Sequence, residues 1–162
     1  EETAAALAPA KPELQKPEDQ KLPLKDGARC KLKGVREVAR IRRMGQITTE
    51  VVGRTRDFLQ AHKAKDGVLV TDDGQPLTIG VVKARINVWA NELGVENPHG
   101  TIFAIGRDAG VPHSSGDPED VLALGKTIVF DIFLQEPGGG YHFDFTRTLC
   151  LGTLQSWCIP PD

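Results

Sequence analysis

The sequence predicts an α+β fold in which two helices precede a mostly antiparallel sheet. Apolar residues recur at helical spacing in the first half of the chain, up to Gly94. From residue 101 onward, apolar stretches of strand length alternate with turn-rich segments. Helices that come first and strands that follow are typical of α+β domains. A chain of 162 residues is long enough for one such domain with a buried core.

The charge, hydropathy and cysteine content bear on the partners and the compartment of the protein. A net charge of −2 argues neither for a nucleic-acid surface nor for an acidic tail. No apolar run approaches the roughly 20 residues of a membrane-spanning helix. The cysteines Cys30, Cys150 and Cys158 lie far apart without C-x-x-C spacing, a pattern that favours a reducing compartment. We therefore expect a cytoplasmic protein that has neither a nucleic-acid nor a membrane partner.

The N-terminal region has the composition of a linker. Residues 1–32 contain four prolines among Glu, Lys, Gln and Ala, as linkers and remnants of a preceding domain do. The first residue is Glu1 and the only methionine is Met44. We therefore expect the chain to be a piece, or a processed product, of a longer protein.

Two helices are expected next. Apolar residues of the first, from residue 34 onward, recur at steps of three or seven: Val38, Ile41, Met44, Val51 and Phe58. Its arginines fit a solvated helix face, with a basic patch as the alternative. Residues 66–77 are rich in turn formers. The second helix starts after Thr78, a suitable N-cap residue, and ends at Gly94.

Three strands complete the expected fold, at residues 101–105, 127–133 and 141–149. A polar loop joins the first two strands and carries His113 in a V-P-H-S-S-G run. A Gly-rich turn at residues 136–140 joins the last two strands as a hairpin would.

The last two strands each contain an aspartate, Asp131 and Asp144, within an apolar stretch. A carboxylate in such a strand is costly to bury unless a positive group compensates it. Two carboxylates on adjacent strands also repel each other, and a bound cation is the simplest remedy. Strand alternation places Asp144 on one face with His142 and Thr146, opposite an aromatic face. The pair therefore predicts part of a metal site.

Structural alternatives exist for each of these polar residues. Asp144 could pair with Arg147 or cap a turn instead of binding a metal. His142 has the spacing of a further ligand, although a strand histidine beside aromatic residues is more often a packing residue. His113, as a single loop histidine, could simply be solvated.

Four runs together resemble the M24 metallopeptidases, the "pita-bread" enzymes that include creatinase, prolidase and several aminopeptidases. They are G-R-D-A-G-V-P-H at residues 106–113, L-G-K-T-I-V-F-D at 124–131, G-Y-H-F-D-F-T-R-T at 140–148 and L-G at 151–152. Within the family, the runs resemble those of the Xaa-Pro aminopeptidase or prolidase branch. The resemblance implies that residues 33–152 are the N-terminal half of a creatinase/aminopeptidase-like catalytic domain. Residues 153–162 form an atypical tail.

The resemblance also implies a set of site residues. In the family, two aspartates, one histidine and two glutamates hold two divalent metal ions. Asp131 would bind one metal, Asp144 would bridge both, and His113 would contact the substrate or the reaction intermediate. The other three ligands would belong to the second half of the domain. Hard carboxylate ligands favour Mn²⁺, with Co²⁺ or Zn²⁺ as alternatives.

The implied activity is hydrolysis of N-terminal Xaa-Pro or related peptide bonds, with a peptide as substrate and a homo-oligomer as the intact enzyme. Because the site is incomplete, we expect this chain alone to be inactive. Two departures from the family pattern concern the hairpin: D-x-G becomes Asp131-Ile132-Phe133, and the hairpin segment at residues 134–140 is longer than usual. The competing interpretation is a non-catalytic M24-like module that binds peptides or proteins, as in histone-chaperone and proliferation-associated proteins.

Overall fold

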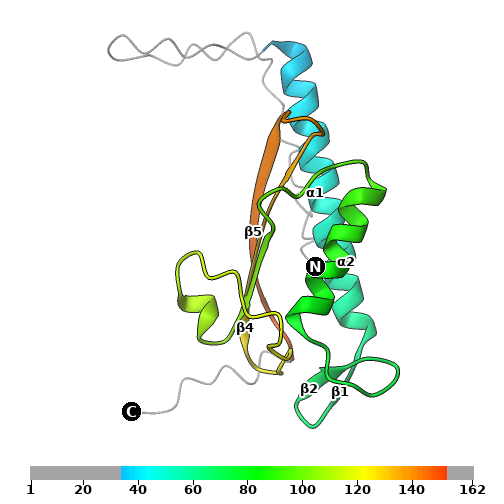
Figure 1. The fold of residues 1–162 in the computed structure, drawn as a ribbon, viewed down its shortest axis with the longest axis vertical. Coiled ribbons are helices and arrows are strands. Elements are labelled where there is room, and N and C mark those ends of the chain that lie inside the picture. The colour runs from blue at the N-terminus through cyan, green and yellow to red at the C-terminus, as the bar shows by residue number, and fades with distance from the viewer. Residues whose placement is uncertain (1–33, 153–162) are drawn as a thin grey trace, which may run out of the picture. The chain divides into compact units, whose positions relative to one another are not determined.

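The computed structural model describes residues 34–152 (Figure 1). Its elements, in chain order, are helix α1 (Val35–Ala61), strands β1 (Lys63–Lys65) and β2 (Val68–Val70), helix α2 (Ile79–Glu92), strand β3 (Thr101–Ile105), the short 3-10 helix η2 (Asp108–Gly110), and strands β4 (Thr127–Gln135) and β5 (His142–Cys150). The expected linker at residues 1–32, the expected tail at 153–162, Cys30 and Cys158 lie outside the described residues.

The expected helices and strands are confirmed. The second helix begins directly after Thr78, and Gly94 follows its end with a φ of +69°. Strands β3, β4 and β5 form an antiparallel sheet in that order, with β4 in the centre. The fold class is therefore α+β, as the sequence predicts. None of the helices in the described part of the chain has both the length and the apolar character needed to cross a membrane.

The short β1–β2 hairpin differs from the expectation for residues 66–77, for which the sequence predicts only turns. Lys63 pairs with Val70 and Lys65 with Val68 across the hairpin. The turn between them is Asp66-Gly67, and both residues have a positive φ, 51° and 80°. An Asp-Gly pair with positive φ at both positions is the signature of a two-residue hairpin turn. That dipeptide was the missed signal.

The core lies between the sheet and the two helices, which cover the same face of β3–β4–β5 (Figure 1). Every second residue of β4 is fully buried there: Ile128, Phe130, Ile132 and Leu134. The intervening residues, Asp131 among them, are half-buried on the other face. The alternation of β4 therefore separates a packed core side from a polar side on which a site can form.

Helix α1 contains two glycines that are expected to respond oppositely to alanine. A Cβ at Gly53 would meet nothing within 4 Å, whereas a Cβ at Gly45 would lie 2.9 Å from Cε2 of Phe143 on β5. Because alanine is the better helix former, Gly53→Ala should raise the free energy of unfolding by about 0.5–1 kcal/mol. Gly45→Ala should lower it by about 1 kcal/mol, since overpacking outweighs that gain. Urea titration of both variants checks this, and equal stabilisation by both would refute the close packing of β5 on α1.

Candidate functional site

Asp131 and Asp144 lie on the same face of the sheet. Asp131 pairs with Thr146 across the β4–β5 ladder, and Asp144 pairs with Phe133. Because paired residues share a face, both carboxylates are on the side away from the helices. The two aspartates are diagonal neighbours rather than directly opposite residues. Diagonal neighbours are roughly 7–8 Å apart, whereas the Cβ atoms of directly opposite residues are roughly 4.5–5.5 Å apart. Asp131 and Asp144 therefore have the longer, diagonal spacing.

The two carboxyl groups influence each other electrostatically. Partial burial, followed by the charge of Asp131 and a hydrogen bond with it, raises the pKa of Asp144 above its usual 3.8. The hydroxyl of Thr146 donates a hydrogen bond to Oδ1 of Asp131 at 2.5 Å. Like charges that raise a carboxyl pKa in this way are relieved by a cation.

The alternative in which Arg147 neutralises Asp144 disagrees with the structure. Arg147 faces the other way in the ladder, opposite Phe130. Its Nη1 donates to the carbonyl oxygen of Thr146 at 2.7 Å, and its guanidinium lies 3.8 Å from the ring centre of Phe145. Among residues 34–152, no ion pair joins Arg147 to Asp144.

His113 and Asp131 line the same cleft. This cleft has a volume of about 300 Å³ and is bounded by β3, β4, Thr146 and the loop at residues 108–114. His113 itself is exposed and has a φ of +60°, a conformation that few residues other than glycine adopt. Backbone strain of this kind occurs often at functional sites. Asp144 is not part of the cleft wall and lies beside it on the same face.

The loop that carries His113 is anchored to β3 and to α2. The amide of Phe103 on β3 donates to the carbonyl oxygen of Ser115 at 3.1 Å. Lys83 on α2 donates from Nζ to the same oxygen at 2.5 Å, and burial lowers the pKa of Lys83. These contacts fix the position of the loop relative to the sheet. Lys83 is not predictable from the sequence, because an isolated helix lysine carries no signal for such a contact.

A second group of rings lies farther along the same strands. His142, at the start of β5, is exposed, and its ring centre is 6.1 Å from that of His99. The ring of His99 lies 5.7 Å from that of Phe133, the residue paired with Asp144. His99 was not singled out from the sequence. In the described part of the chain, no three His, Cys, Asp or Glu side chains lie close enough to hold a metal ion.

The fold and the sequence motifs together match one known protein family. The profile of metallopeptidase family M24 matches residues 39–157. The chain belongs to metallopeptidase family M24. The resemblance predicted from the four sequence runs is therefore confirmed. No curated protein gives a significant match.

Solved structures of M24 enzymes share the fold at low sequence identity. The prolidase from Pyrococcus furiosus matches with a TM-score of 0.56 and 19% identity, over 73% of this chain and 32% of that one. A dipeptidase from Mycobacterium ulcerans gives a TM-score of 0.57 and 24% identity, over 75% and 28%. The X-Pro aminopeptidase from Thermotoga maritima gives 0.54 and 21%, over 75% and 30%. The chain thus spans about a third or less of the length of these structures.

Proposed function

We propose that this chain is the N-terminal half of the catalytic domain of a dinuclear-metal aminopeptidase. The intact enzyme would hydrolyse N-terminal Xaa-Pro or related peptide bonds through a metal-activated water, and this chain alone is inactive. The observation that carries the proposal is the placement of Asp131 and Asp144 on one polar face, beside the cleft that contains His113. The fold neighbours named prolidase and X-Pro aminopeptidase support the choice of substrate class.

The residues present fit one half of such a metal site. Asp131 and Asp144 supply hard carboxylate oxygens, which suit Mn²⁺ and leave Co²⁺ or Zn²⁺ possible. The raised pKa of Asp144 reflects a pair of like charges that gains from a cation. Divalent ions held there would polarise a peptide carbonyl and activate a water molecule. The remaining ligands would come from the second half of the domain.

Each of the three residues has a role that its position supports. Asp131 is oriented by the hydroxyl of Thr146, which donates a hydrogen bond to its Oδ1. Asp144, the diagonal neighbour, is placed to share a cation with it. His113 borders the cleft next to Asp131, where its imidazole can hydrogen-bond to a bound peptide.

An activity assay tests the proposal. The purified chain, mixed with Xaa-Pro peptides and Mn²⁺, is expected to give no turnover, because two carboxylates hold too little positive charge to generate hydroxide near neutral pH. A longer protein that adds the second half of the domain is expected to cleave the same peptides. In that protein, Asp144→Asn should lower kcat/KM by about a hundredfold or more, whereas Asp57→Asn on the outer side of α1 should not.

Two results would contradict this assignment. Turnover that follows the purified short chain and disappears in Asp144→Asn would show that the half-site is sufficient. A longer protein that binds peptides equally well with and without Mn²⁺, and never cleaves them, would favour the non-catalytic binding module.

A further inference from the structure

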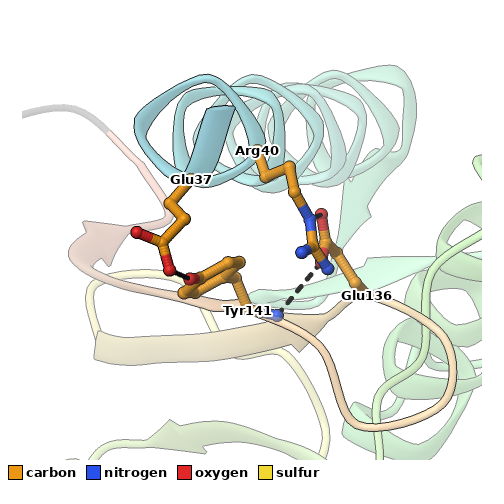
Figure 2. Close-up of polar contacts among 4 residues, drawn as sticks. All are labelled: Glu37, Arg40, Glu136 and Tyr141. Carbon is orange, nitrogen blue, oxygen red and sulfur yellow. Dashed lines mark hydrogen bonds and ion pairs between the residues drawn. The ribbon is translucent and has the colours of Figure 1, made fainter. Parts of the chain in front are cut away.

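Four side chains, which we call the hairpin clamp, tie the β4–β5 turn to the first part of α1: Glu37, Arg40, Glu136 and Tyr141 (Figure 2). The hydroxyl of Tyr141 donates to Oε1 of Glu37 at 2.6 Å. Arg40 donates from Nη2 to Oε2 of Glu136 at 2.5 Å and from Nε to both carboxylate oxygens at 3.1–3.2 Å. The guanidinium also lies 4.9 Å from the ring centre of Tyr141.

The hairpin clamp contacts the hairpin at the residue pair that closes its turn, Glu136 and Tyr141. Glu136 directly follows β4, and Tyr141 directly precedes β5. The amide of Glu136 donates to the carbonyl oxygen of Tyr141 at 3.0 Å, and the amide of Tyr141 donates to Oε2 of Glu136 at 3.2 Å. A Cβ at position 140 would lie 2.5 Å from Oε2 of Glu136, so Gly140 allows the glutamate to fold back over the turn. The ion pair with Arg40 also lowers the pKa of Glu136 below its usual 4.5.

The hairpin needs such a support because its turn and its outer strand specify the register weakly. The turn contains three consecutive glycines, and Gly138 and Gly139 have a positive φ. The type and length of the turn set the register of a hairpin, and a turn of conformationally permissive glycines sets it weakly. Strand β5 is at the edge of the sheet, and its core-facing Phe143 and Phe145 are only half-buried. A slip by one residue would turn Asp144 toward the helices, and a slip by two would change its distance from Asp131.

We propose that the hairpin clamp positions Asp144 beside Asp131 by fixing the register of β5 against β4. The inference rests on the proposed function, since the position of Asp144 matters for a metal site. Glu37, Arg40, Glu136 and Tyr141 are thus positioning residues, which act through the hairpin. Because the Arg40 side chain is 55% exposed, its ion pair contributes little to overall stability. Its effect is expected to be local to the hairpin.

The test compares Arg40→Met with a matched control on the same helix. Arg54 also lies on α1 and bridges Glu50 at 2.6 Å and Glu92 on α2 at 3.0 Å, away from the hairpin. Mn²⁺ affinity is measured by calorimetry, and local order by amide hydrogen exchange at residues 142–146. Arg40→Met is expected to weaken Mn²⁺ binding by about three- to tenfold, as loss of groups that orient metal ligands does. It should also speed exchange at these amides, whereas Arg54→Met should leave both readouts close to those of the unaltered chain.

Two further variants separate positioning from general destabilisation. Arg40→Lys keeps the charge but loses the forked geometry, so it should recover part of the Mn²⁺ affinity. Tyr141→Phe removes only the hydroxyl and should act in the same direction as Arg40→Met. Equal losses of affinity in Arg40→Met and Arg54→Met, or an unchanged affinity in Arg40→Met, would overturn the inference. If the unaltered chain fails to bind Mn²⁺, the half-site that the proposed function places at Asp131 and Asp144 is refuted. Unchanged exchange at residues 142–146 in Arg40→Met would overturn the register argument separately.

Discussion

Replacing Gly116 with alanine is expected to lower the free energy of unfolding by about 3–5 kcal/mol, the largest stability effect among the substitutions considered. A Cβ at this position would lie 2.1 Å from the carbonyl oxygen of Phe103, which belongs to the backbone of β3 and cannot rotate away. The backbone at Gly116 also has a φ of +81°, which costs an L-residue further free energy. The His113 loop must therefore separate from β3. Urea or thermal unfolding measures the loss.

Gly74→Ala is the matched control for this substitution. Gly74 has a φ of +79°, and a Cβ there would meet nothing within 4 Å. Its replacement should cost only the conformational term, about 1–2 kcal/mol. Equal losses of stability in Gly116→Ala and Gly74→Ala would mean that the His113 loop does not approach β3 as closely as the structure indicates. The cleft wall that this loop forms would then have a different shape.

Asp131→Asn and Asp144→Asn are each expected to weaken Mn²⁺ binding by about tenfold or more, because an amide lacks the negative charge of a carboxylate ligand. Asp57→Asn, at an exposed position of α1, should leave binding unchanged. Calorimetric titration of the three variants gives the comparison. Equal affinity in all three would place the Mn²⁺ elsewhere on the protein.

The same variants should remain folded, which keeps the metal prediction independent of stability. The pKa of Asp144 is raised in the folded protein, so the folded state binds this proton more tightly than the unfolded chain does. The contribution of Asp144 to stability therefore falls as the pH rises from about 3.8 through the raised folded pKa. At neutral pH, Asp144→Asn should leave stability unchanged or raise it by less than about 1 kcal/mol, since the side chain is largely exposed and screened.

Helices and strands with a strong hydrophobic periodicity could be predicted from the sequence. The spacing of α1, the N-cap residue Thr78 before α2 and the apolar alternation of β4 each identified an element that the structure contains. These signals are local, because burial of one face imposes a period of 3.6 or 2 on the sequence. The β1–β2 hairpin could not be predicted in this way, because its strands have three residues each. Three residues are too few to show an alternation of apolar and polar side chains.

The geometry of the candidate site was predictable only in part. Alternation along each strand placed Asp131 and Asp144 on one face, but the diagonal register depends on where the hairpin closes. That closure involves Glu136 and Arg40, which are 96 positions apart in sequence. The contact of Lys83 with the His113 loop is also long-range. Contacts of this kind leave no local pattern in a single sequence.

Paramagnetic broadening by Mn²⁺ in a ¹⁵N–¹H spectrum of the chain shows whether a cation binds at Asp131 and Asp144. Sub-stoichiometric Mn²⁺ broadens amide signals close to the ion, so even a weak half-site can be located. We expect the amide signals of Asp131, Asp144 and Thr146 to broaden first, and we expect Asp144→Asn to abolish this pattern. Signals that stay sharp at these three residues, while broadening centres on another acidic segment such as Asp72 and Asp73, would contradict it.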